Sequence, residues 1–511
     1  MNKLSRREWL GVTAAAGAVS CVRKVERPNI LFVLADDQSW PHAGAYGAKQ
    51  VATPAFDLVA RDGILFRNSF AACPSCTPSR SAVLSGRNIW QQREAGVLYG
   101  SMPVELPLYT HLLEDAGYFV GYTGKGWAPG DWSALGLKRN PCGREFNSRK
   151  HAEAVPPGID LRDYAANFTD FLAAKPADAP FCFWFGSTEP HRLYDKGRGA
   201  RLGKKIADVN VPAFLPDTPE VRSDILDYYS EIDWFDAQLA RVLKALDAAG
   251  LAGNTLVVVT SDNGMPFPHA KVNLYDWGTH MPLAMRWPGR IAPGQVRDDL
   301  VSHVDFAPTF LEAAGLTADT GMSGRSLLRP DASREAIFTG MERHTMCRPD
   351  GGTYPMRAIR MKRFLYIRNF APDRWPTGGP DFISSNKQPH GDIDDGPVKA
   401  VITQPDAELK YPAAYRACIA KRPAEELYDV VTDPAQINNL AADPAQAVNV
   451  SRLRSRLEEY LRETRDPRIE GLDPWQGYTY HQTVGYGASF NNSLSQPKRD
   501  EAAGKATHKP E

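Results

Sequence analysis

The sequence predicts an α/β protein: a mainly parallel sheet sandwiched by helices, with a smaller C-terminal antiparallel α+β subdomain. Asn29–Ala35 is a continuous apolar run, which is typical of a strand buried on both faces. Arg222–Ala249 repeats apolar residues at every third or fourth position, as a helix packed on a core does. Strand-like and helix-like segments alternate up to about residue 330, which favours parallel strands joined by helices.

The other elements of this first part follow in order. Further strands are expected at Phe119–Thr123, Pro180–Ser187, Thr255–Thr260 and Pro282–Trp287. Gly250 ends the long helix, and a second helix is expected from Asp305 to Ala314. In parallel sheets the ligand lies at the carboxyl ends of the strands. Polar groups follow four of these strands: Asp36-Asp37, Gly124-Lys125, Glu189-Pro190-His191 and Ser261-Asp262-Asn263-Gly264.

The pattern changes after about residue 330. Met356–Phe370 mixes basic and apolar residues, which predicts a solvent-facing antiparallel hairpin. Residues 371–412 are rich in Pro, Gly and Asp and are expected to form loops, and Val450–Arg465 is an amphipathic helix pattern. We therefore expect a catalytic domain over residues 28–330, a C-terminal subdomain over residues 331–470 and a disordered tail over residues 490–511.

Composition excludes several classes of partner. Lys+Arg and Asp+Glu are balanced at 60 each, so no basic field indicates nucleic acid. No apolar stretch reaches the length of about 18 residues that a membrane span needs, which predicts no transmembrane segment. Seven cysteines in 511 residues give no disulfide framework.

The N-terminus looks like an export signal. Ser5-Arg6-Arg7 resembles a twin-arginine motif, and a short Ala/Gly/Val-rich region follows it. Ala18-Val19-Ser20-Cys21 resembles a lipoprotein processing site, although leucine is usual three residues before the cysteine. Residues 1–21 are therefore expected to direct export to the periplasm or cell surface, with a possible lipid anchor at Cys21; a disordered basic N-terminus is the alternative.

The segment that begins at Cys76, CTPSRS, predicts a reactive residue at the start of a helix. Pro78 favours a first helical turn, and Gly86 offers a helix end. Cys76 would then lie near free backbone N–H groups and the positive end of the helix dipole, where anions bind. Arg80 adds a permanent charge suited to a tetrahedral oxyanion. A buried structural cysteine, or a redox pair with Cys73, explains the neighbouring Pro-Ser-Arg less well.

From Cys76 to Arg87 the chain reads C-x-P-S-R-x-x-x-L-x-G-R, which resembles the signature of the type I sulfatases. In that family the cysteine is oxidised to formylglycine (3-oxoalanine), whose hydrated aldehyde is the nucleophile. The resemblance covers about residues 28–465. It implies an alkaline-phosphatase-like fold and a formylglycine-generating or maturase enzyme as partner.

Two oxygen-rich pairs, Asp36-Asp37 and Asp262-Asn263, follow separate strands. Taken alone, each has an ordinary explanation as a cap or a turn. Together they offer only oxygen ligands, which suit a hard cation such as Ca²⁺ or Mg²⁺ and argue against zinc. The resemblance implies one Ca²⁺ held by these four residues and modified Cys76. The cation would polarise a sulfate oxygen and favour the ionised nucleophile.

The resemblance also implies roles for basic residues that could otherwise be surface or turn residues. Arg80 and Lys125 would bind the formylglycine and the sulfate, while His191 and Lys271 would face the bridging atom. His191 would protonate the leaving group. One hydroxyl of the hydrated aldehyde would attack sulfur, and the second would then lose its proton and expel sulfate.

One position departs from the family pattern. Many members have Gly-Lys-x-His, and that histidine assists the second half of the cycle, whereas this chain has Trp127 in its place. Either another histidine serves, with His42, His269 and His280 as candidates, or the second half proceeds with less assistance.

Within the family the chain looks most like the heparan N-sulfatase (sulfamidase) branch. Pro190-His191-Arg192 and the segment from Ser261 to Pro268 are among the matching stretches. The resemblance implies hydrolysis of sulfate esters or N-sulfo groups of sulfated polysaccharides or oligosaccharides. His280, His344 and Arg348 are candidate sugar contacts. A phosphatase or phosphodiesterase of the same superfold, and an inactive sulfated-glycan-binding relative, remain alternatives.

Overall fold

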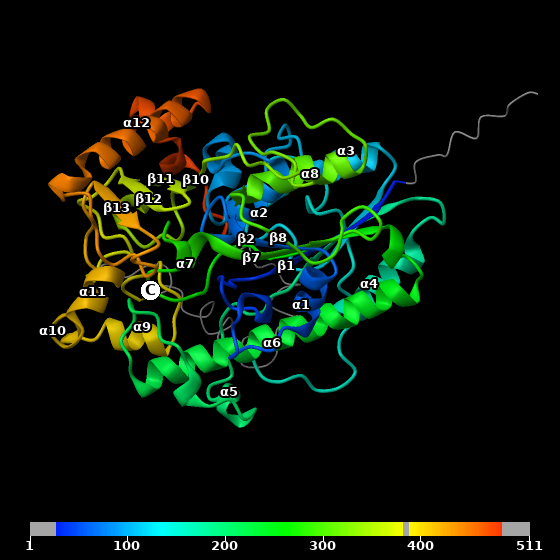
Figure 1. Ribbon diagram of the computed structural model, residues 1–511, viewed down its shortest axis with the longest axis horizontal. Coiled ribbons are helices and arrows are strands. Elements are labelled where there is room, and N and C mark those ends of the chain that lie inside the picture. Colours follow the sequence, from blue (N-terminus) through cyan, green and yellow to red (C-terminus); the bar gives the residue numbers. More distant parts are fainter. Residues whose placement is uncertain (1–26, 382–387, 483–511) are drawn as a thin grey trace, which may run out of the picture.

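A mainly parallel sheet runs through the centre of the molecule, with helices on both faces (Figure 1). The computed structural model describes residues 27–381 and 388–482. The expected export signal, Cys21 and the tail over residues 490–511 lie outside these described residues. Among the described helices, none combines the length and the apolar character needed to cross a bilayer.

The large sheet has nine strands in the described part of the chain. Their order is β4 (Arg144–Glu145), β3 (Phe119–Gly124), β5 (Phe181–Gly186), β1 (Asn29–Ala35), β6 (Thr255–Ser261), β7 (His280–Arg286), β2 (Ile64–Phe70) and β8 (Gln295–Arg297), and β9 (Val301–Ser302) also pairs with β2. Strand β7 is antiparallel to both neighbours, and every other pair is parallel. The predicted mainly parallel sheet is therefore confirmed.

The five predicted strands of this sheet all exist, with ends that differ by no more than two residues. The prediction missed β2, because Arg67 and Asn68 interrupt its apolar pattern. Arg67 is exposed, whereas Phe66 and Phe70 are buried, so β2 lacks the continuous apolar run that marks β1.

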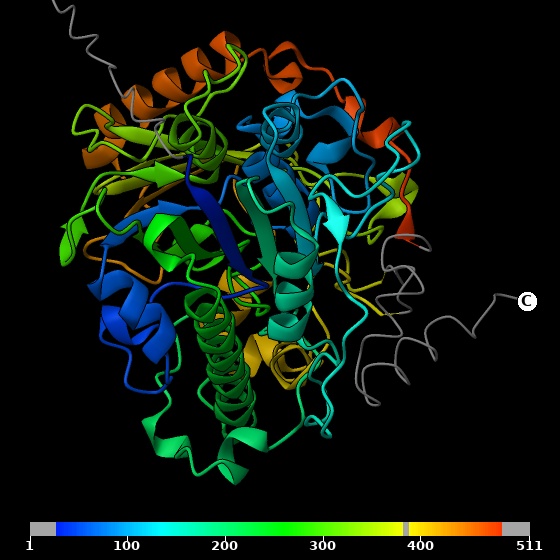
Figure 2. The same ribbon diagram turned by 90° about the vertical axis from the view of Figure 1, so that its right-hand side faces the viewer.

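Alternate side chains of β1 supply two separate cores. Ile30, Phe32 and Leu34 pack beneath α2 (Cys76–Ser85), α3 (Tyr109–Asp115) and α8 (Phe306–Ala313). Leu31, Val33 and Ala35 face α1 (Pro54–Arg61), α4 (Tyr164–Ala174) and α6 (Pro219–Ala248). Figures 1 and 2 show these two helical layers on opposite faces of the sheet. The strand is apolar throughout because neither face meets water.

The predicted long helix is α6, which begins three residues earlier than expected. Its start is set by Thr218, whose side chain accepts a hydrogen bond from the Val221 N–H, and by Pro219 in the first turn. The predicted second helix is α8, preceded by a short 3₁₀ turn over His303–Asp305.

A second, four-stranded antiparallel sheet follows in the C-terminal part. It contains β10 (Ala336–Met341), β11 (Met356–Met361), β12 (Phe364–Asn369) and β13 (Glu425–Asp429), and α12 (Ala447–Glu463) packs against it. The predicted hairpin is β11 and β12, but the expectation that it faces solvent is wrong. Arg357 of β11 is fully buried because Asp466 and Glu342 neutralise its guanidinium.

Short helices complete the described chain: α5 (Arg198–Arg201), α7 (Asp276–Thr279), α9 (Pro397–Ile402), α10 (Ala407–Lys410) and α11 (Pro412–Cys418). The prediction of loops over residues 371–412 is wrong where α9 and α10 lie. Pro397 begins α9, where its missing N–H costs nothing. The expected domain division near residue 330 stays a prediction.

Candidate active site

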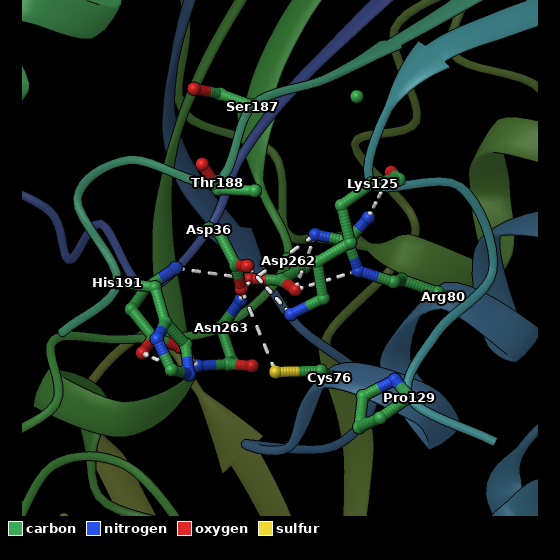
Figure 3. A network of polar contacts seen from close by, with 12 residues as sticks. Asp36, Cys76, Arg80, Lys125, Pro129, Ser187, Thr188, His191, Asp262 and Asn263 are labelled. Carbon is green, nitrogen blue, oxygen red and sulfur yellow. Dashed lines mark hydrogen bonds and ion pairs between the residues drawn. The ribbon is translucent and has the colours of Figure 1, made fainter. Parts of the chain in front are cut away.

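Side chains from four strand ends and one helix converge at the carboxyl edge of the large sheet. Asp36 follows β1, Lys125 follows β3, His191 follows β5 and Asp262 follows β6. Figure 3 shows these side chains directed toward Cys76 and its neighbours. Because β3, β5, β1 and β6 are adjacent and parallel, their carboxyl ends meet at one edge.

Cys76 opens α2, as the sequence predicts. Ser75 is the extended residue before the helix (φ −155°, ψ 139°), and Gly86 ends it in the left-handed region at φ 65°, where glycine is favoured. Cys76 is buried, and its Sγ lies 3.6 Å from Asp36 Oδ1. Burial raises the pKa of the thiol well above its usual range, although Lys125 lowers it in part. The thiol is therefore protonated at neutral pH and a weak nucleophile in this form.

Arg80, on α2, contacts the segments that follow β3 and β6. Its Nε and Nη2 lie 2.9 and 2.8 Å from Asp262 Oδ2, and its Nη1 donates to the carbonyl oxygens of Lys125 and Gly126 at 2.8 and 3.0 Å. The guanidinium has no exposed surface. The carboxylate of Asp262 balances this buried charge, and Nη2 makes no hydrogen bond among the described residues.

Two neighbouring cations keep the carboxyl of Asp36 ionised. Lys125 Nζ donates to Asp36 Oδ2 at 2.6 Å, and Arg80 Nη2 lies 3.7 Å from Asp36 Oδ1. Burial alone would raise the pKa of this carboxyl, but Lys125 and then Arg80 hold it far below its usual range.

In Asp37, the next residue, the pKa of the carboxyl is raised rather than lowered. Its backbone is in the left-handed region (φ 75°), and its N–H donates to Asp262 Oδ1 at 3.1 Å. The side chain accepts from Asn263 Nδ2 at 2.6 Å and from Lys271 Nζ at 2.7 Å. Burial raises the pKa of Asp37 to about 6, against the effect of Lys271. Burial and the neighbouring Asp36 likewise raise the pKa of Asp262 to about 6.

His191 lies at the less buried side of the cluster. Its Nδ1 is 2.6 Å from the carbonyl oxygen of Arg192, which can only accept, so Nδ1 carries a proton. Its Nε2 lies 3.8 Å from Asp37 Oδ2. Burial, with Lys271, lowers the pKa of His191 to about 3. The imidazole is therefore neutral until a further negative charge enters.

The residues fit a hard cation. Asp36, Cys76 and Asp262 each place a ligand atom within 4.8 Å of the others. Asn263 Oδ1 is buried and has no hydrogen-bond partner among the described residues. A cation would be stabilised by an unpartnered amide oxygen of this kind beside two carboxylates. The donor set of Asp36, Asp37, Asp262 and Asn263 is all oxygen, as Ca²⁺ or Mg²⁺ prefers.

Asp394 belongs to this cluster and was missed by the sequence analysis. Its Oδ2 lies 3.0 Å from Lys271 Nζ, so Lys271 is shared between Asp37 and Asp394. The available signal was the acidic run from Asp392 to Asp395 within a Pro- and Gly-rich segment. That run alone could not show which carboxylate reaches the site.

The predicted sugar contacts are placed differently from one another. His344 Nδ1 lies 2.9 Å from the hydroxyl of Ser75, directly before Cys76. Arg348 pairs with Asp392 at 2.8 Å. His280 is not brought to the cluster, because its ring stacks between Trp40 and Phe70 and its Nε2 donates to a backbone carbonyl. Substrate contacts of all three stay predictions.

The side chain of Trp127 packs in the hydrophobic core and not among the charged groups around Cys76. It is fully buried in the core beneath α2, and its indole N–H donates to Ser81 Oγ at 2.7 Å. Two histidines suggested as substitutes have other contacts. His42 Nδ1 lies 3.3 Å from the hydroxyl of Tyr228, and His269 lies between two backbone carbonyls. These contacts hold the rings within the fold.

Comparison with known proteins gives consistent results. The family model described as Sulfatase matches residues 28–316. An ulvan-active sulfatase of Formosa agariphila is 30% identical over 435 residues, covering 82% of this chain and 77% of that protein. The N-sulphoglucosamine sulphohydrolase of Homo sapiens is 28% identical over 489 residues, covering 86% and 91%. A solved structure in complex with its substrate, D-glucosamine-2-N,6-O-disulfate, has a TM-score of 0.65 at 19% identity and covers 88% of this chain and 100% of that chain.

Proposed function

Because the chain belongs to the sulfatase family and is a sulfuric ester hydrolase, we propose that it releases sulfate from sulfated saccharides at a centre built on Cys76. One observation carries the proposal. Cys76 opens a buried helix within 3.6 Å of Asp36, where carboxylates and cations from four strand ends converge. A plain structural cysteine would need none of these charges.

The surroundings of Cys76 support the proposal that this residue is modified to formylglycine. The thiol has a pKa well above its usual range because it is buried, so unmodified Cys76 is a poor nucleophile. A hydrated aldehyde there would supply one hydroxyl for attack and a second for release of sulfate, which a thiol cannot do. The N-terminal turn of α2 and the charges of Lys125 and Arg80 favour an anionic form of that group.

Ca²⁺ fits the oxygen ligands of Asp36, Asp37, Asp262 and Asn263, together with the modified side chain at position 76. When bound, the cation would polarise a sulfate oxygen and lower the pKa of the attacking hydroxyl. Asn263 Oδ1 would then gain the partner that the described residues do not give it.

The chain's own residues would bind and orient the sulfate. Arg80 and Lys125 bring two buried positive charges to the side of Asp36, where the oxygens of the transferred group gain charge. His191 and Lys271 lie on the opposite side, around Asp37. An anionic substrate beside His191 favours its protonated form, so His191 could then protonate the departing atom.

Similar proteins act on saccharides, as their names record: an ulvan-active sulfatase and an N-sulphoglucosamine sulphohydrolase. We extend that substrate class to this chain, with the N- or O-linkage open. Export to the periplasm or cell surface, a maturase that acts on Cys76 and a lipid at Cys21 complete the proposal. An exported enzyme of this class meets sulfated polysaccharide directly.

Mass spectrometry of the tryptic peptide Asn68–Arg80 from natively produced protein tests the centre. We expect the mass of an aldehyde at position 76, and sulfate release from sulfated oligosaccharides that Cys76→Ala abolishes. Phosphoesters are the comparison substrates. An unmodified thiol in a fully active preparation, or faster turnover of phosphoesters than of sulfated substrates, would contradict the proposal.

A further inference from the structure

The cluster around Cys76 has a closed side and an open side. The side chains of Asp36, Arg80 and Asp262 are exposed by 2%, 0% and 0%. His191 and Asp394 are exposed by 19% and 27%. A sulfate group held by Arg80 would therefore lie at the closed side, and the departing saccharide would lie at the open side, beside His191 and Asp394.

Asp394 is held firmly at this open side. Its Oδ2 lies 3.0 Å from Lys271 Nζ, and one of its carboxylate oxygens lies within 4.8 Å of ligand atoms of Asp37 and His191. Its chain neighbours are also fixed. Asp392 pairs with Arg348 at 2.8 Å, and Asp395 pairs with Lys399 at 2.8 Å.

We propose that Asp394 is a specificity-determining residue of this site, and that it favours substrates whose leaving group departs as an amine over those whose leaving group departs as an alcohol. This inference rests on the proposed function, because it assigns a role at the same centre. The inference implies that the sugar bound at the open side is an amino sugar.

The chemistry of the two leaving groups differs in charge. When an S–N bond breaks, R–NH–SO₃⁻ and water give R–NH₃⁺ and SO₄²⁻, and the nitrogen gains two protons. When an S–O bond breaks, R–O–SO₃⁻ and water give R–OH, SO₄²⁻ and a proton that leaves to solvent. An ammonium beside Asp394 gains a charge-assisted hydrogen bond, whereas a hydroxyl gains a weaker one. The ammonium of Lys271, 3.0 Å from Asp394 Oδ2, favours the charged form of this carboxylate.

Binding of the product amine tests the inference without requiring a modified Cys76. Calorimetric titration of the unmodified protein with glucosamine and with glucose should show weaker glucosamine binding for Asp394→Asn. A hydrogen bond to a charged group is worth enough for a loss of about tenfold or more. Glucose binding should change less. Asp395→Asn is the matched control, since it alters the adjacent carboxylate, which pairs with Lys399, and it should bind both sugars as the unsubstituted protein does.

Turnover gives the second readout. With the active enzyme, Asp394→Asn should lower kcat/KM for N-sulfoglucosamine about tenfold more than for 4-nitrophenyl sulfate, and Asp394→Glu, which keeps the charge, should recover part of the difference. Unchanged glucosamine binding in Asp394→Asn, or equal losses on both substrates, would overturn the inference. If the unsubstituted enzyme releases no sulfate from any compound, the proposed function itself fails, and the two failures are thereby distinguished.

Discussion

Replacing Arg80 by methionine removes a fully buried guanidinium and leaves its partners in place. The variant loses the contacts of 2.8 and 2.9 Å to Asp262 and those of 2.8 and 3.0 Å to the carbonyl oxygens of Lys125 and Gly126. Methionine fills similar space but donates no hydrogen bond. Removing one partner of a buried ion pair costs about 3–5 kcal/mol, because the other charge stays buried and uncompensated.

Urea denaturation in the presence of a chelator measures this loss as a change in the free energy of unfolding. The matched control is Arg456→Met. Arg456 pairs with Glu335 at 2.9 Å, but the two side chains are 36% and 67% exposed. A surface pair of this kind contributes about 0–1 kcal/mol. Arg80→Met should therefore lower the free energy of unfolding more than Arg456→Met does, because only the charge of Arg80 is buried.

A double variant separates the ion pair from packing. In the background of Asp262→Asn, the substitution Arg80→Met should cost less, because the carboxylate that it would strand is already neutral. A loss by Arg80→Met that is no larger than that of Arg456→Met would refute the reasoning, as would strict additivity of the two changes.

Three further predictions concern the same centre. Cys76→Ala should abolish sulfate release, while its thermal midpoint stays close to that of the unmodified, metal-free protein, because the Cys76 thiol makes one weak polar contact, to Asp36; a residual rate near that of the unsubstituted enzyme would count against a role for position 76. His191→Gln should slow hydrolysis of a saccharide by about 10²–10⁴-fold but affect 4-nitrophenyl sulfate less, since nitrophenolate leaves without a proton; equal effects in a kinetic comparison would remove the proton-donor role. In the metal-free protein, the contribution of Asp37 and Asp262 to the free energy of unfolding should fall as pH rises from 3.8 to about 6, because their raised pKa values mean that the folded state holds their protons more tightly. Added Ca²⁺ should remove this fall, and unfolding curves that are identical with and without Ca²⁺ across this range would contradict it.

Local signals predicted much of the site. The apolar run of β1 ends at Asp36 and Asp37, and the Cys76 segment forms a helix that ends at Gly86, as the sequence indicates. These features depend on a few neighbouring residues: an apolar strand, a proline in the first turn and a glycine at the end. Parallel order then brings the strand ends together.

Contacts between distant segments could not be predicted in this way. Asp394 reaches Lys271 across 123 positions, and the buried Arg357 meets Asp466 across 109. No periodicity encodes such pairs, so an acidic run was taken for a loop and a basic strand for a surface hairpin. The same limit applies to His280, since stacking on two aromatic rings depends on the tertiary fold.

The direction of β1 places the start of the described chain and the active site at opposite edges of the sheet. The described chain enters at Arg27, at the amino edge of the sheet, and Asp36 lies at the carboxyl edge. Because the described chain begins at the edge opposite Asp36, the lipid proposed at Cys21 would join this molecule on the side away from Asp36, which would leave the carboxyl edge facing glycan in the surrounding medium.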